Sequence, residues 1–162
     1  MELPKRKSNR LKGYDYSQKG AYFITMCVKD RHEMLWNVGA RIARPQNSAE
    51  LSKFGDVTDH AINEIPKHYP SVSVDKYVIM PNHVHMILRL YDNDGRAMRA
   101  PTIATIINQM KGYTTKQIGF SLWQKLYHDH IIRTEEEYEK IWTYIDGNPM
   151  NWETDCFYNT EL

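Results

Sequence analysis

Hydrophobic residues recur at every second position over residues 83–90, and the chain just before them, residues 72–80, forms a second candidate strand. A period of two is typical of strands that bury one face. Pro81 and Asn82 lie between the two segments, where proline presets φ for a tight turn and asparagine tolerates an unusual backbone conformation. The pattern therefore predicts a β-hairpin.

The second arm of this hairpin begins with two histidines, His83 and His85. Side chains two residues apart on a strand point to one face, so we expect the two imidazoles side by side. The opposite face is wholly apolar and consists of Val84, Met86, Leu88 and Leu90. Two adjacent imidazoles form a partial ligand set for a cation. The alternative is a pair of exposed histidines on a half-solvated strand.

Two more elements are predicted nearer the N-terminus. Residues 21–28 are apolar at nearly every position and rich in aromatic and β-branched side chains, as in a central strand buried on both faces. Apolar residues recur at three- and four-residue steps over residues 51–65, which predicts a helix. Asn47 or Ser48 is available as its N-cap, and we expect the helix to close near Pro66.

The second half of the chain predicts two helices separated by an extended segment. Thr102 can cap a helix over residues 103–118, and residues 122–132 are typical of an extended or strand-like return. The elements then follow the order strand, helix, strand, strand, helix, strand, helix. This order predicts an α+β domain of ferredoxin-like (RRM-like) type, in which helices pack on an antiparallel sheet.

The last helix carries a second informative pattern. Thr134 and Glu137 have the spacing of a capping box. Tyr144 and Asn148 lie about 40° apart around the helix axis, at the margin of its apolar stripe, and Pro149 ends the helix directly after Asn148. The stripe itself consists of Tyr138, Ile141, Trp142 and Ile145. The alternative is that Tyr144 is a half-buried edge tyrosine and Asn148 only a stop signal.

Composition favours one domain spanning residues 1–162, because 162 residues with 41% hydrophobic content can bury a real core but are too few for two. The net charge of +1 gives no overall signal for nucleic acid. Basic residues nevertheless define an N-terminal arm over about residues 1–13: Lys5, Arg6, Lys7, Arg10 and Lys12. A solvated terminus is the alternative for this arm.

The two cysteines, Cys27 and Cys156, lack the spacing of a metal site and are expected to be free thiols in a reducing compartment. No apolar stretch approaches the length of a membrane span, and the basic N-terminus is not followed by an apolar signal region. We therefore expect a cytoplasmic protein without a membrane partner.

Cationic and aromatic residues interleave just after the basic arm: Arg10, Lys12, Tyr14, Tyr16 and Lys19. Cations neutralise phosphates and aromatic rings stack on unpaired bases, a combination typical of single-stranded nucleic-acid binding. The alternative is an ordered segment that covers the edge of the sheet. Lys111 and Lys116 could extend a phosphate track, although two lysines on a helix are commonly a solvated face.

A rival constellation occurs at Tyr127, His128 and His130, where another His-x-His pair follows another tyrosine. These histidines also share a face if the segment is extended. The segment lacks both the tight turn and the wholly apolar opposite face of the first pair. A supporting or DNA-contacting role for His130 and a core role for Tyr127 are the favoured interpretations.

Four segments in this order and at these separations resemble the REP-associated tyrosine transposases, within the His-hydrophobe-His (HUH) single-tyrosine transposases. The segments are RLKGYDYSQKGAYFIT, VIMPNHVHMIL, LWQKLYHDHIIR and YIDGNPMNW. The resemblance spans nearly the whole chain. It implies a ferredoxin-like fold of HUH endonuclease type and a substrate of single-stranded or hairpin (REP-like) DNA, which the segment from Arg10 to Lys19 would recognise.

The resemblance also implies roles for particular residues. It assigns a divalent cation to His83 and His85, with Asn148 completing the metal site, and the nucleophile to Tyr144. Mixed nitrogen and oxygen ligation favours Mg²⁺ or Mn²⁺. A phenol has a pKa of about 10 and is a weak nucleophile until it loses its proton. The cation would withdraw charge from the phosphate under attack.

The first hypothesis is thus a metal-dependent transposase or endonuclease that cleaves and transfers single-stranded DNA through a covalent tyrosyl-DNA intermediate. A non-catalytic nucleic-acid-binding module of the same fold is a second hypothesis, and an HUH nuclease of replication or conjugation is a third. Both a monomer and a homodimer are compatible with the sequence. In a homodimer, the tyrosine helix can serve its own subunit or its partner's.

Overall fold

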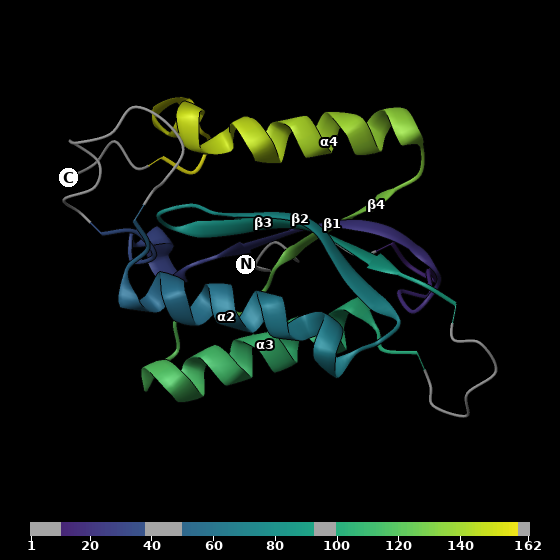
Figure 1. Ribbon diagram of the computed structural model, residues 1–162, viewed down its shortest axis with the longest axis horizontal. Helices are drawn as coiled ribbons and strands as arrows, with labels where there is room; N and C mark the ends of the chain where they lie inside the picture. The colour runs from purple at the N-terminus through teal and green to yellow at the C-terminus, as the bar shows by residue number, and fades with distance from the viewer. Residues whose placement is uncertain (1–10, 38–49, 93–99, 159–162) are drawn as a thin grey trace, which may run out of the picture.

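The structure is a computed structural model that describes residues 11–37, 50–92 and 100–158 (Figure 1). Its centre is one four-stranded sheet in the order β2-β3-β1-β4, and every neighbouring pair is antiparallel. The strands are β1 (Gly20–Cys27), β2 (Val72–Ile79), β3 (His83–Leu90) and β4 (His128–Ile132). The helices are α2 (Lys53–His68), α3 (Ile103–Ile118) and α4 (Glu135–Gly147), with short 3-10 helices η1 (Lys29–Arg31) and η2 (Asn148–Thr154).

This topology confirms the predicted ferredoxin-like fold. The chain runs β1, α2, β2, β3, α3, β4, and each helical crossover places the next strand two positions away in the sheet. Helices α2 and α3 cover one face of the sheet, while α4 lies across the other face (Figure 1). The sheet is therefore enclosed between two helical layers.

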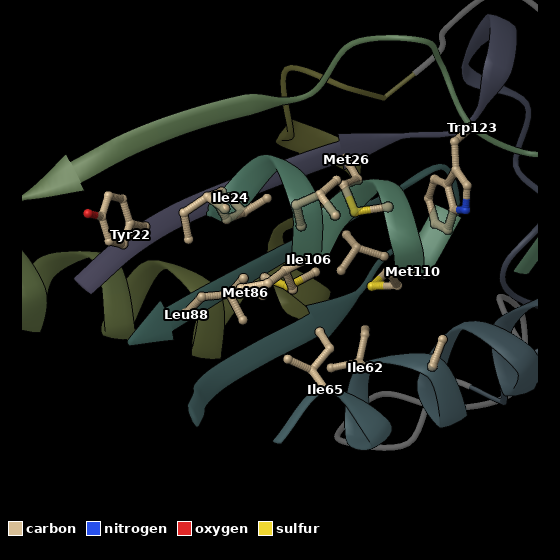
Figure 2. Close-up of a cluster of buried hydrophobic side chains, with 14 of the residues drawn as sticks. Tyr22, Ile24, Met26, Ile62, Ile65, Met86, Leu88, Ile106, Met110 and Trp123 are labelled. Atoms are coloured by element: carbon tan, nitrogen blue, oxygen red, sulfur yellow. The ribbon is translucent and has the colours of Figure 1, made fainter. Parts of the chain in front are cut away.

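The main core fills the space between the sheet and the pair α2 and α3. Figure 2 shows the side chains of Tyr22, Ile24 and Met26 from β1 above those of Ile62 and Ile106 from the two helices. All five are essentially buried. The apolar side chains of β1 and those of the apolar faces of α2 and α3 thus pack into the same core from opposite sides.

The face that carries the histidines is buried as well, so the alternative of exposed histidines is wrong. A second apolar cluster forms around Ala21, Ile87 and Ile145, where α4 packs on the sheet. Because α4 covers this face, the alternation of β3 does not separate a core face from a solvent face. It separates two different cores.

Two predictions about α2 are corrected. Its N-cap is Ser52, whose hydroxyl accepts hydrogen bonds from the backbone N–H groups of Phe54 and Gly55, and not Asn47 or Ser48, which lie outside the described residues. Pro66 lies inside the helix, which continues to His68. Proline removes only its own N–H, and the last turn is closed by a hydrogen bond from Tyr69 to the Ile65 carbonyl.

The caps of the other two helices are confirmed. The Thr102 hydroxyl accepts from Thr105 N, and the Thr134 hydroxyl accepts from Glu137 N at 3.1 Å. The Glu137 carboxylate accepts from the N–H of Arg133, one residue earlier than in a standard capping box.

Within the predicted return over residues 122–132, only β4 is a strand of the sheet, and Trp123 adds a single bridge to Val28. Cys27 and Cys156 are free, as predicted. In the part of the chain that the structure describes, no helix is long and apolar enough to cross a bilayer.

Candidate metal and nucleophile site

His83 and His85 open β3 immediately after the tight turn at Pro81 and Asn82. The backbone N–H of Met80 donates to the carbonyl of His83 at 2.8 Å and closes this turn. The two imidazole rings lie 4.5 Å apart between their centroids. Their exposed fractions are 0% and 2%. The strand therefore brings both rings together in a buried pocket under α4.

The side-chain amide of Asn82 determines which nitrogen of His83 carries a proton. Its Nδ2 donates to the carbonyls of Arg31 (3.2 Å) and Phe157 (2.8 Å), so its Oδ1 is left to face His83 Nδ1 at 2.8 Å. An amide oxygen only accepts, and Nδ1 of His83 is therefore the protonated nitrogen. The Nε2 lone pair remains, and this buried atom has no hydrogen-bond partner among the residues that the structure describes.

His85 is held in a similar way. Its Nδ1 hydrogen-bonds the Thr25 hydroxyl at 2.8 Å, and its Nε2 lies 3.3 Å from the hydroxyl of Tyr144. Burial lowers the pKa of both His83 and His85 to about 3. Both imidazoles are thus neutral at physiological pH, which is the form that binds a cation.

The nucleophile candidate Tyr144 projects from α4 toward this pocket. Its ring centroid lies 5.3 Å from that of His85 and 6.3 Å from that of Phe23. The side chain is 44% exposed, so a substrate can reach its hydroxyl. Burial raises the pKa of Tyr144, and a hydrogen bond with Asn148 acts in the opposite direction. The phenol is consequently protonated at neutral pH.

Asn148, one turn after Tyr144, forms the C-cap of α4 and is only 3% exposed. Its Oδ1 is buried and, within the described ranges of the chain, has no hydrogen-bond partner. A buried amide oxygen without a partner carries a desolvation cost unless something else satisfies it. An unsatisfied amide oxygen can ligate a cation, and this role stays a prediction for Asn148.

Asp155 also lies beside the histidines, although the sequence did not predict it as a site residue. One ligand atom each from His83, His85 and Asp155 lies within 4.8 Å of the others. Asp155 directly follows η2. In the same segment, the rings of Trp152 and Phe157 lie near the ring of His83, at centroid distances of 5.9 and 4.4 Å. This segment has no helical or strand periodicity. The only available signal was a carboxylate a few residues beyond Pro149.

Helix α4 is fixed to the sheet by polar contacts away from the pocket. A bulge in β2 at Asp75 directs its carboxylate to Arg89 (2.7 Å) and to the hydroxyl of Tyr138 on α4 (2.8 Å). Lys76 pairs with Asp146 of α4. These contacts set the position of α4 on the sheet, and with it the position of Tyr144.

The rival histidines lie elsewhere. His128 and His130 are exposed on β4, and His130 pairs with Glu137 of α4. Among the residues that the structure describes, the candidate metal cluster contains neither of them. Tyr127 packs against the main core.

The predicted DNA-binding residues do not gather around the pocket. Tyr14 and Tyr16 pack against each other and against Tyr22 in the main core. Lys19 pairs with Asp92, Lys12 is exposed, and Arg10 lies outside the described residues. Their contact with DNA stays a prediction.

Lys111 is also engaged within the fold. Its ammonium donates to the carbonyls of Gln124 (2.9 Å) and Leu126 (3.4 Å), and burial lowers its pKa to about 8. Its role toward DNA stays a prediction, and in this geometry its charge is directed at main-chain oxygens.

Comparisons with known proteins agree with the fold. No family model matches the chain. An uncharacterized protein of Haemophilus influenzae is 32% identical over 173 aligned positions, which cover 94% of this chain and 93% of that protein. A REP-associated tyrosine transposase of Escherichia coli is 23% identical over 136 residues, covering 83% of this chain and 69% of that protein.

Among solved structures, a REP-associated tyrosine transposase bound to a REP hairpin shares the fold, with a TM-score of 0.64. Its sequence identity is 21%, and the match covers 88% of this chain and 74% of that chain. The named sequence relatives and the shared fold indicate a domain of the transposase class. The chain belongs to the REP-associated tyrosine transposase family.

Proposed function

We propose that this protein cleaves and rejoins single-stranded DNA through a covalent bond between Tyr144 and a DNA phosphate. The observation that carries this proposal is the 3.3 Å separation between the Tyr144 hydroxyl and Nε2 of His85. It supports a site in which the nucleophile and the metal ligands serve one phosphate. Tyrosine and histidines come from one chain, so a single chain can supply the whole constellation.

The residues act as follows. The oxygen of Tyr144 attacks phosphorus and loses its proton, the bond from phosphorus to the leaving sugar oxygen breaks, and that oxygen takes up a proton. A tyrosyl-DNA ester results, and it retains the energy of the broken bond for rejoining to a new sugar hydroxyl. The side chain of Tyr144 is about half exposed, so a DNA strand can approach it. The packing of its ring against His85 and Phe23 holds the hydroxyl in place.

His83 and His85 would hold a divalent cation through their Nε2 atoms, with oxygen donors from Asn148 and Asp155. Two neutral imidazoles with an amide and a carboxylate oxygen form a mixed set that suits Mn²⁺ or Mg²⁺. Such a cation would draw charge from the non-bridging oxygens of the phosphate. Asn82 and Thr25 support the site from behind: the amide oxygen of Asn82 fixes the tautomer of His83, and the hydroxyl of Thr25, which can donate or accept, holds the ring of His85 in its orientation.

We further propose hairpin (REP-like) DNA as the substrate. Family membership supports this, since the solved relative is bound to a REP hairpin. Unpaired flanks of a hairpin expose bases for aromatic stacking, which a continuous duplex does not. Action on DNA would place the protein in the cytoplasm, in keeping with its free thiols.

A denaturing gel tests the reaction. Labelled hairpin oligonucleotides with single-stranded flanks should give a protein-linked band with Mn²⁺ or Mg²⁺ and none in EDTA, whereas a blunt duplex of the same sequence should give none. Equal reaction with the duplex would contradict the assigned substrate. Binding of the hairpin without any covalent band would favour the non-catalytic binding module.

A further inference from the structure

Two phenylalanine rings pack together at the surface where α2 begins and α3 ends. Phe54 lies in the first turn of α2, and Phe120 directly follows Gly119, which ends α3 in the left-handed conformation. The ring centroids lie 5.5 Å apart in an edge-to-face arrangement. Phe120 is nevertheless 43% exposed. Exposed apolar surface costs free energy in water, so this ring offers a partner a favourable contact.

A lysine completes this aromatic pair. The ammonium of Lys53 lies 5.0 Å from the centroid of the Phe54 ring, and its side chain is exposed. Within the described ranges of the chain, Lys53 forms no ion pair, and Asp56 of the same helical turn does not neutralise it. A cation beside aromatic rings is typical of surfaces that bind single-stranded nucleic acid, because the cation attracts phosphates and the rings stack on bases. We call Lys53, Phe54 and Phe120 the aromatic platform.

The start of α2 connects the aromatic platform to the turn before His83. The backbone N–H of Ser52, the N-cap, donates to the carbonyl of Leu35 at 2.9 Å. The N–H of Leu35 in turn donates to the carbonyl of Pro81 at 2.9 Å. Pro81 lies in the turn that precedes His83, so a single segment of chain around Leu35 separates the start of α2 from that turn.

The loop after Phe120 connects the aromatic platform to the same strand end from the other side. The backbone N–H of Gln124 donates to the carbonyl of Cys27 at 2.9 Å, and Cys27 pairs with His83 in the sheet. Lys125, the next residue of this loop, is exposed and has no ion-pair partner in the part of the chain that the structure describes. The platform and this second cation therefore lie at the end of the sheet that carries the histidines.

The other end of the tyrosine helix is unfavourable for DNA. Glu135 and Glu139 of α4 are exposed, and neither forms an ion pair with another described residue. They precede Tyr144 by nine and five residues, about 14 and 8 Å along a helix. A DNA strand that leaves Tyr144 toward the start of α4 would therefore meet negative charge, whereas a strand that passes the end of the sheet meets Lys125 and Lys53.

We propose that the aromatic platform binds the single-stranded flank of the DNA substrate: Phe120 stacks on an unpaired base, and Lys53 contacts a phosphate of the same flank. Base stacking requires no particular sequence, since every base has a π face. The platform thus holds the flank without reading its sequence. The inference rests on the proposed function, because it names a further contact of the same substrate.

Binding of two matched oligonucleotides tests the stacking contact. One fluorescent hairpin carries intact single-stranded flanks, and the other carries abasic nucleotides in the flanks, so that the phosphates remain and the bases are lost. Phe120→Leu removes the aromatic face and keeps an apolar side chain, whereas Phe120→Trp keeps an aromatic face. Tyr113→Leu removes an exposed ring of α3 that contacts His60 and serves as the control. Thermal unfolding of each variant is recorded.

We expect Phe120→Leu to bind the intact hairpin about tenfold more weakly, as for the loss of one stacked base, and to bind the abasic hairpin like the wild type. Phe120→Trp and Tyr113→Leu should bind both oligonucleotides like the wild type. Wild-type affinity of Phe120→Leu for the intact hairpin would overturn the proposal. An equal loss on both hairpins would overturn it as well, because the ring would then only support the fold. This comparison decides even if Phe120→Leu unfolds at a lower temperature, since a weakened fold lowers the affinity for both.

A salt series tests Lys53 separately. Lys53→Gln should reduce the slope of log affinity against log salt by about 0.7, as for one phosphate contact on a single strand. Lys67→Gln, at the opposite end of α2, is the control and should keep the wild-type slope. An unchanged slope in Lys53→Gln would exclude the phosphate contact.

The platform and the proposed reaction fail separately. The covalent band of the wild-type protein is scored on the intact hairpin, and its absence contradicts the proposed reaction. A covalent band together with wild-type binding by Phe120→Leu contradicts the platform alone. Size-exclusion chromatography without DNA tests a different occupant: a wild-type dimer that Phe120→Leu converts to a monomer would assign the platform to a second copy of the chain and overturn the proposal.

Discussion

The amide oxygen of Asn82 lies 2.8 Å from Nδ1 of His83 and leaves the Nε2 lone pair of that histidine as its only site for a cation. The adjacent residue in the sequence thus acts as the outer support of a metal ligand. Such supports commonly change metal affinity by about 10- to 100-fold when removed. This relationship leads to the first prediction.

Asn82→Ala should weaken Mn²⁺ binding about 10- to 100-fold, measured by calorimetric titration, because His83 loses the partner that fixes its tautomer. Asn63→Ala on the exposed side of α2 is the control and should bind Mn²⁺ like the wild type. Unchanged affinity in Asn82→Ala would show that the amide does not orient the ligand.

The two oxygen donors should contribute unequally. Asp155→Ala should weaken Mn²⁺ binding more than Asn148→Ala, because it removes a charge as well as a donor, and a water molecule can replace a neutral amide oxygen. His83→Ala and His85→Ala should each lose most of the cleavage activity. Full metal affinity in Asp155→Ala would exclude the carboxylate from the site and leave Asn148 as the oxygen ligand.

Removal of the metal should affect chemistry and leave the fold intact. Chelation should abolish DNA cleavage while it changes the thermal midpoint little, because the core between the sheet and the helices is formed without a metal. Addition of Mn²⁺ or Mg²⁺ should restore cleavage. Differential scanning calorimetry measures the thermal midpoint. A large drop of this midpoint in EDTA would mean that the cation is structural.

The carboxylate of Asp75 should make stability depend on pH. Its burial opposes ionisation, but hydrogen bonds from Ser73, Arg89 and Tyr138 outweigh burial and hold the pKa of Asp75 below its usual value. A lowered folded-state pKa stabilises the protein above the usual carboxyl pKa of about 4, and this contribution disappears as the pH falls through the folded-state pKa.

Asp75→Asn should therefore reduce the free energy of unfolding by about 1–2 kcal/mol at pH 7 and by less in acid. Denaturant unfolding between pH 2.5 and 7 measures this difference. Tyr138→Phe is a matched variant that removes one of the three hydrogen bonds and should lose less. A loss that is constant over the whole range would assign the effect to packing and not to charge.

Much of this architecture follows from local patterns. The alternation after Pro81 and Asn82 predicts β3 with its observed bounds, and the capping spacing of Thr134 and Glu137 predicts the start of α4. Both depend on interactions between residues close in sequence, which a pattern records directly. The approach of Tyr144 to His85 also follows once α4 is placed on that face.

Other features depend on contacts between distant segments. Trp152 and Phe157, which lie far along the chain, pack against His83 and bury it, so the local alternation indicated only a shared face. Asp155 lies in an irregular segment without periodicity, and nothing local indicated its approach to the histidines. The apolar periodicity begins at Leu51, but Leu51 forms a β-bridge with Trp36 and is therefore extended. The helix α2 can begin only after this residue, so Ser52 is its N-cap.

The identity of the residue bound to DNA tests the central claim most directly. The covalent complex formed on a hairpin oligonucleotide is digested with protease, and the modified peptide is identified by mass spectrometry. The account predicts a nucleotide on Tyr144, and it predicts that Tyr144→Phe keeps its fold and DNA binding but forms no adduct, while Tyr127→Phe still reacts. A nucleotide on Tyr127, or an adduct that persists in Tyr144→Phe, would contradict it.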